Sequence, residues 1–188
     1  MYIIHPNGDI DDQDMEQLQE LLEVLDHQFK LNTDLRVKTH PPDQNLFWDR
    51  LSYITGLGFV MCQQYINISC PTNIIKMNEA LGLPPMHTSG YSIVQLINTA
   101  ANYWKHYQVD TDLPKGSLYK STIEVVGKLG FPIEYPYVCE GFLEKIVETG
   151  NQPFSKLSYF LKEWRASLIK KCQHVAPVDN QGGAAVPS

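Results

Sequence analysis

The segment from Asn45 to Ile66 carries apolar side chains around nearly its whole circumference. They recur at helical spacing as Phe47, Trp48, Leu51, Ile54, Leu57, Val60, Met61, Tyr65 and Ile66. A helix that is apolar on all sides has to be covered by its neighbours, so this segment predicts a central buried helix. We expect the core to include Leu51, Ile54, Leu57 and Met61. Because glycine weakens a helix interior, Gly56 and Gly58 indicate that a neighbouring backbone approaches closely.

Helical patterns recur in six further segments, which cover residues 12–30, 72–81, 91–107, 116–129, 138–149 and 153–172. The stretch 32–42 is expected to be a linker because Pro41 and Pro42 forbid a helix there. Strand signals are confined to Tyr2, Ile3 and Ile4 and to residues 133–138. The fold is therefore expected to be all-α, a compact bundle of five to seven helices. We expect a single domain over residues 1–174 and a disordered tail over residues 175–188, which lack apolar periodicity.

Net charge, cysteine spacing and the lengths of apolar runs limit which classes of function this chain can have. The 188-residue chain has a formal net charge of −6, which argues against non-specific binding to nucleic acid, although it leaves room for a local basic site. Its cysteines, at positions 62, 70, 139 and 172, lack metal-ligand spacing, so we expect neither a metal nor another cofactor. With no signal peptide and no membrane-spanning apolar run, a soluble cytoplasmic protein is expected.

The expected helix 91–107 carries one narrow polar strip opposite its apolar side. Gln95, Thr99, Asn102 and His106 stack in a row, flanked by Asn98 and Lys105. His106 can exchange a proton near neutral pH. Lys105 can hold a phosphate, and Asn102 can orient a ribose or the imidazole. These three are the candidate catalytic residues, with Gln95, Thr99 and Arg50 as candidate binding residues. The alternative is that the strip is an ordinary solvated face.

The segment Asn102-Tyr103-Trp104-Lys105-His106 resembles the N-x-x-K-H signature of some helical proteins of the HEPN superfamily. That resemblance implies a small α-bundle from bacterial stress or phage-defence systems, often dimeric. In active members it implies a metal-independent RNase, whose histidine acts on the ribose 2′-hydroxyl. Active members also carry an arginine shortly before the histidine, and here that region reads Thr99-Ala100-Ala101. Arg50 of the central helix is the candidate replacement, and a structural ion pair is the alternative interpretation of Asp49 and Arg50.

Three functional hypotheses follow. The first is a HEPN-like RNase, or a catalytically degenerate relative that binds RNA. The second is a non-catalytic protein-interaction subunit or inhibitor, and a homodimer is compatible with both. The third is a small-molecule pocket within the bundle. Convergence of His106, Lys105 and Arg50 in one cleft favours the first hypothesis, whereas three separate surfaces favour the second.

Two other groups have simpler interpretations. The loop 84–90 contains His87 and Ser89 but no acidic partner, so we interpret it as a connection between helices. On the last helix, Trp164 falls on the apolar stripe and is expected in the core. Lys156, Lys162 and Arg165 on that helix are interpreted as a solvated basic face.

Overall fold

The computed structural model of the chain describes residues 2–4, 10–40, 44–107, 117–132, 137–147 and 153–175. These residues form one short hairpin and seven helices, which confirms the all-α bundle. The elements are β1 (Tyr2–Ile4), β2 (Ile10–Asp12), α1 (Gln13–Lys38), α2 (Gln44–Ser69), α3 (Met77–Leu81), α4 (Ile93–Tyr107), α5 (Ser117–Lys128), α6 (Val138–Val147) and α7 (Pro153–Val175).

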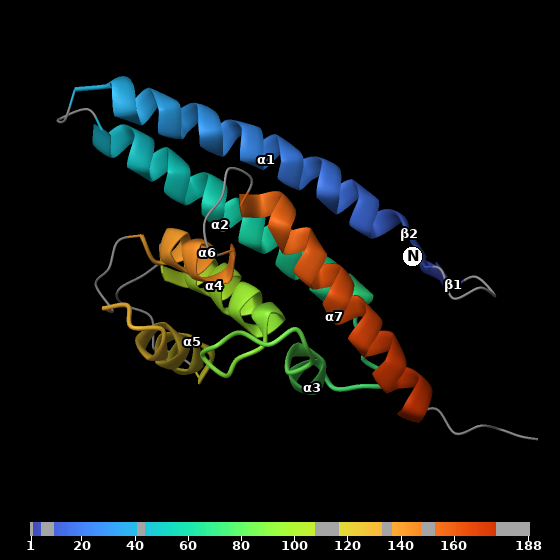
Figure 1. Ribbon diagram of the computed structural model, residues 1–188. Helices are drawn as coiled ribbons and strands as arrows, with labels where there is room; N and C mark the ends of the chain where they lie inside the picture. The colour runs from blue at the N-terminus through green and yellow to red at the C-terminus, as the bar shows by residue number, and fades with distance from the viewer. Residues whose placement is uncertain are drawn as a thin grey trace, which may run out of the picture.

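The helices are arranged in two layers. The long helices α1, α2 and α7 lie side by side, and α3, α4, α5 and α6 form a second layer against them (Figure 1). Helix α2 contacts α1, α4, α6 and α7, so it holds the central position that its sequence predicts. The core runs between the layers, and its fully buried side chains include Phe59 of α2, Leu96 and Ile97 of α4, and Trp164 of α7.

The predicted core of α2 is only partly correct. Leu51 is buried, whereas Ile54, Leu57 and Met61 are half-buried and pack against the edge of the core. Apolar side chains therefore extend around α2 beyond the part of its surface that the neighbouring helices cover. Such half-buried apolar side chains are normal on a protein surface and need no separate explanation.

The two glycines of α2 allow close approach, but by aromatic side chains rather than by a backbone. A Cβ atom added at Gly56 would lie 2.0 Å from Cδ1 of Trp104 on α4. One added at Gly58 would lie 2.7 Å from the ring of Phe154 on α7. Because real Cβ atoms do not approach other atoms so closely, these two positions let α4 and α7 pack tightly on α2.

The expectation of a linker over residues 32–42 is wrong for residues 32–38, because α1 continues to Lys38. The polar side chains there bond to the preceding helical turn: Nδ2 of Asn32 donates to the Gln28 carbonyl, and Oγ1 of Thr33 donates to the Phe29 carbonyl. The guanidinium of Arg36 lies 3.9 Å from the ring centroid of Trp48 on α2. Packing against α2 thus outweighs the weak helix propensity of this stretch.

Other boundaries also shift. The expected strand at Tyr2–Ile4 is confirmed as β1, and it pairs antiparallel with β2, which the sequence pattern did not indicate. The helix expected over 72–81 is shorter and begins at Met77. Residues 133–136 and 176–188, which include most of a predicted strand and of the predicted tail, lie outside the described residues.

Candidate functional site

Gln63 of α2 is the centre of a hydrogen-bond network between α2 and α4. Its side chain is almost fully buried. Its Nε2 donates to Oδ1 of Asn98 at 2.7 Å and to Oδ1 of Asn102 at 2.9 Å. Its Oε1 accepts from Nζ of Lys105 at 2.7 Å. Asn98, Asn102 and Lys105 of the predicted polar strip are therefore turned toward α2, where they join the two helices.

The remaining residues of the strip have different surroundings. Thr99 is buried, and its hydroxyl donates to the carbonyl of Gln95 one turn earlier. Gln95 is half-buried, and its backbone N–H donates to the Ser92 hydroxyl at the start of α4. His106 is exposed near the end of the helix. The row predicted from the sequence thus divides into members packed within the bundle and one solvent-facing imidazole.

Arg50 lies on the side of α2 that faces α1. Its guanidinium carbon is 5.7 Å from the ring centroid of Phe47 on the same helix. It also lines an open hollow of about 470 Å³ together with Gln28 and Asn32 of α1. Gln63 is thirteen residues further along α2, or about 20 Å along the helix axis. Arg50 is therefore remote from the Gln63 network, and its role as the missing arginine stays a prediction.

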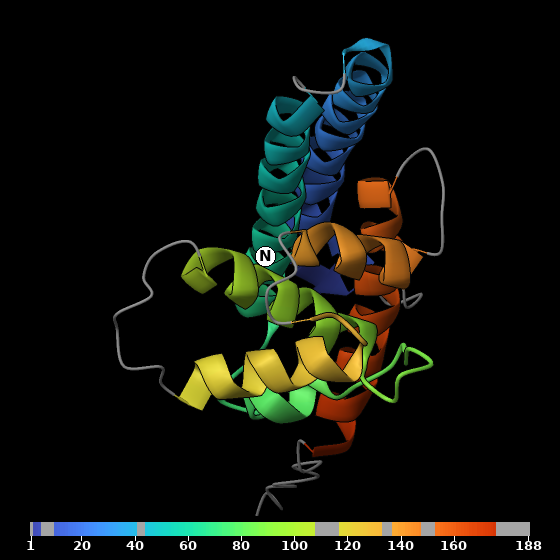
Figure 2. The same ribbon diagram turned by 90° about the vertical axis from the view of Figure 1, so that its left-hand side faces the viewer.

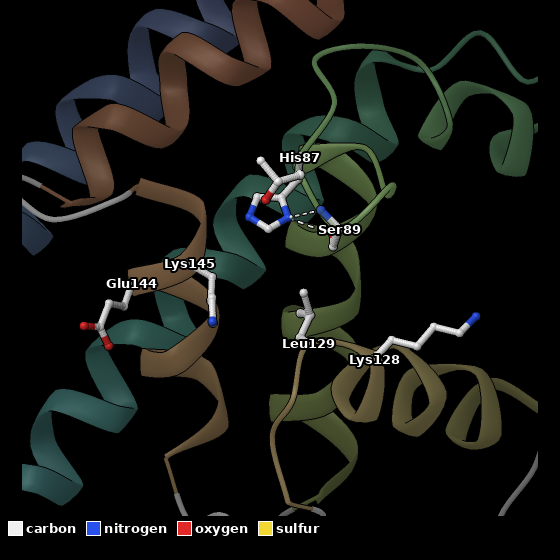
Figure 3. A pocket seen from close by; sticks show the side chains of 7 residues that line it. His87, Ser89, Lys128, Leu129, Glu144 and Lys145 are labelled. Atoms are coloured by element: carbon white, nitrogen blue, oxygen red, sulfur yellow. Dashed lines mark hydrogen bonds between the residues drawn. The ribbon is translucent and has the colours of Figure 1, made fainter.

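A second hollow, of about 380 Å³, lies where the loop before α4 meets α5 and α6 (Figure 3). Nδ1 of His87 lies 2.8 Å from Oγ of Ser89 and accepts the Ser89 backbone N–H at 3.1 Å. Because Nδ1 accepts this hydrogen bond, the ring proton of a neutral His87 imidazole lies on Nε2. Lys145 of α6 and Lys128 of α5 also line the hollow.

The described residues around His87 do not assemble the catalytic groups of a serine hydrolase. Glu144 extends away from the imidazole in Figure 3, as does Lys128, whose Nζ pairs with Glu124 at 2.7 Å. No carboxylate among the described residues orients the His87–Ser89 pair, so a complete Ser–His–acid triad is not assembled there. Sequence analysis missed Lys128 and Lys145 because they are distant from His87 in the chain.

Arg165 corrects another sequence interpretation, because it is buried rather than part of a solvated face. Its Nη1 donates to the carbonyl of Ser69. Its Nε lies 3.9 Å from Oδ2 of Asp12, which also accepts a 2.6 Å hydrogen bond from the Tyr65 hydroxyl. Burial, and next the hydrogen bond to Asp12, raise the pKa of Tyr65. Trp164 beside it is buried as predicted.

Glu140 of α6 is a half-buried carboxyl group whose pKa is raised above its ordinary value. Burial raises its pKa to about 7, although its own backbone amide and the Ser52 hydroxyl lower it in part. Neither carboxylate oxygen has a hydrogen-bond partner at standard distance in the described part of the chain. A carboxyl group with this pKa can exchange protons near neutral pH, and such groups occur both in active sites and in purely structural positions.

No group of three His, Cys, Asp or Glu residues within the described ranges could hold a metal ion. The four cysteines are free thiols, and Cys62, Cys70 and Cys139 are buried. None of the described helices is both long enough and apolar enough to cross a membrane.

No family model, curated protein or solved structure matches this chain. The resemblance to HEPN proteins therefore rests on residues 102–106 and the helical layout, and it stays a prediction.

Proposed function

We propose that this protein is a non-catalytic interaction subunit that binds a helix of another protein chain through the outer face of α1. A row of apolar side chains on that face carries the proposal. Leu21, Val24, Leu31 and Leu35 are between 40% and 57% exposed. Together with Gln28 they follow the alternating three- and four-residue spacing of a helix–helix contact. We call these five residues the outer seam.

The outer seam is separate from the stripe that α1 buries in its own bundle. Met15, Leu18, Leu22 and Leu25 form that buried stripe. The outer seam lies roughly a third of a turn around the helix from it. Two exposed side chains of α2, Leu46 and Tyr53, add apolar surface beside the seam, across the hollow that Gln28 lines. Exposed apolar side chains that gather on one face in this way are typical of a protein-binding surface.

The polar strip gives less support to an RNase. Asn102 and Lys105 are engaged with Gln63, whereas catalysis would need them to meet ribose and phosphate. Arg50 faces α1, away from this network. The formal net charge of −6 also opposes attraction of RNA. This separation matches the arrangement that favours the interaction hypothesis.

The test places a photo-reactive amino acid at Val24 in the full chain, within the cells that normally make it. The matched control carries the same amino acid at Tyr159, which is exposed on α7. We expect illumination to join Val24, but not Tyr159, to a protein. Mass spectrometry identifies the attached peptide, whose sequence should carry the apolar spacing of an amphipathic helix. Absence of a protein adduct at Val24, or equal adducts at both positions, would contradict the proposal.

A parallel assay addresses the RNase hypothesis directly. Purified wild-type protein and the His106→Ala variant are incubated with total RNA in excess EDTA. We expect neither protein to cleave RNA. Cleavage by the wild type that disappears in His106→Ala would overturn the non-catalytic assignment.

A further inference from the structure

We infer that the occupant of the outer seam is a second copy of this chain, whose α1 packs antiparallel to the first. This inference rests on the proposed function and names the partner for the same surface. Figure 1 shows α1 along one edge of the bundle, with the other helices on its inner side. Figure 2 shows the C-terminal end of α1 and the N-terminal end of α2 extending beyond the remaining helices. Two α1 helices can therefore meet along much of their length.

The charge distribution along α1 favours an antiparallel pair. Its first half carries the exposed acids Glu16, Glu20 and Glu23. Its second half carries the exposed bases Lys30 and Lys38 and one exposed acid, Asp34. A parallel pair would place the acids of one copy beside the same acids of the other, whereas an antiparallel pair places acidic halves beside basic halves.

The apolar side chains follow the same symmetry. A two-fold axis beside Gln28 brings Leu21 and Val24 of one copy level with Leu35 and Leu31 of the other. Such an interface is self-complementary, as two-fold symmetry requires. The 26-residue helix is about 39 Å long, which gives the seam several helical turns of contact.

The first measurement is the molar mass of the purified full chain by light scattering and sedimentation. We expect a dimer at about 100 μM, and at least a tenfold weaker self-association for Leu31→Glu. The matched control Tyr159→Glu changes an exposed residue on α7 and should remain dimeric. Circular dichroism confirms that each variant is folded. A wild-type chain that stays monomeric, or a Leu31→Glu variant that dimerises as the wild type does, overturns the inference.

Orientation is tested by mixing Leu21→Cys and Leu35→Cys proteins under mild oxidation. An antiparallel pair predicts that the mixed disulfide exceeds either homodimeric disulfide, whereas a parallel pair predicts the reverse and overturns the assigned geometry. Separately, Glu20→Lys or Lys38→Glu alone should weaken association, because both residues flank the outer seam and come nearly level across the two-fold axis, and the two changes in one chain should restore it. A monomeric chain whose Val24 still joins a different protein in cells would reject self-association while leaving the proposed function intact.

Discussion

At the scale of single residues, Asp26 shows how one carboxylate joins distant parts of the chain. Although it lies on α1, it is buried and accepts the backbone N–H groups of Phe154 at 2.8 Å and Ser155 at 2.9 Å. It therefore caps the start of α7. Asp26→Asn removes the charge and one acceptor, so we expect the free energy of unfolding to fall by about 1–3 kcal/mol.

Urea denaturation followed by circular dichroism measures this loss. Asp34→Asn is the matched control, because Asp34 is exposed on the same helix. An Asp26→Asn variant as stable as that control would show that the cap contributes little.

Glu140 predicts a pH dependence of stability. Its pKa is raised by burial from 4.5 to about 7 in the folded state. Between these values the unfolded chain releases a proton that the folded chain keeps, so this residue makes stability fall as the pH rises. Glu140→Gln should remove that fall and, at about pH 8, raise the free energy of unfolding by on the order of 3 kcal/mol.

Denaturation of wild type, Glu140→Gln and Glu144→Gln across this pH range checks the sign. Glu144 is exposed on the same helix, so its variant should keep the wild-type slope. A Glu140→Gln variant whose stability still falls between these pH values in parallel with the wild type would refute the assignment.

At the scale of elements, the contact between α2 and α4 depends on Gln63. Gln63→Leu would leave the side chains of Asn98, Asn102 and Lys105 without their shared partner. Because unsatisfied polar groups are costly inside a protein, we expect a loss of about 1–3 kcal/mol. Gln64→Leu is the matched control, since Gln64 is exposed one position away. Equal stability of the two variants in urea would show that the network is not needed.

Periodicity predicted the existence of the main helices better than their ends or their polar contacts. The pattern of α2 indicated a central helix because apolar spacing reports burial directly. It did not reveal that α1 continues past Asn32, because packing against Trp48 decides that extension. Nor did it reveal the partners of Gln63, which lie 35–42 positions away in the chain. Contacts made only after folding leave no local signal.

At the scale of the whole molecule, the two layers are connected at several separate points. Gln63 links α2 to α4, and α6 packs against both α2 and α7. Nε1 of Trp164 on α7 donates to the Ala80 carbonyl of α3 at 2.8 Å. With links on both sides of the interlayer core, we expect the bundle to unfold as one cooperative unit.

Trp164→Phe tests that expectation, because it removes the bond to Ala80 and leaves a cavity at a fully buried position. We expect it to lower the free energy of unfolding by about 2–4 kcal/mol while keeping a single transition. Far-UV circular dichroism reports all helices, and fluorescence of the remaining Trp48 and Trp104 reports the α2 contacts. The two signals should change at the same urea concentration. Tyr159→Phe, at an exposed position on α7, should unfold as the wild type does. Separate midpoints for the two signals in Trp164→Phe would mean that the layers unfold independently.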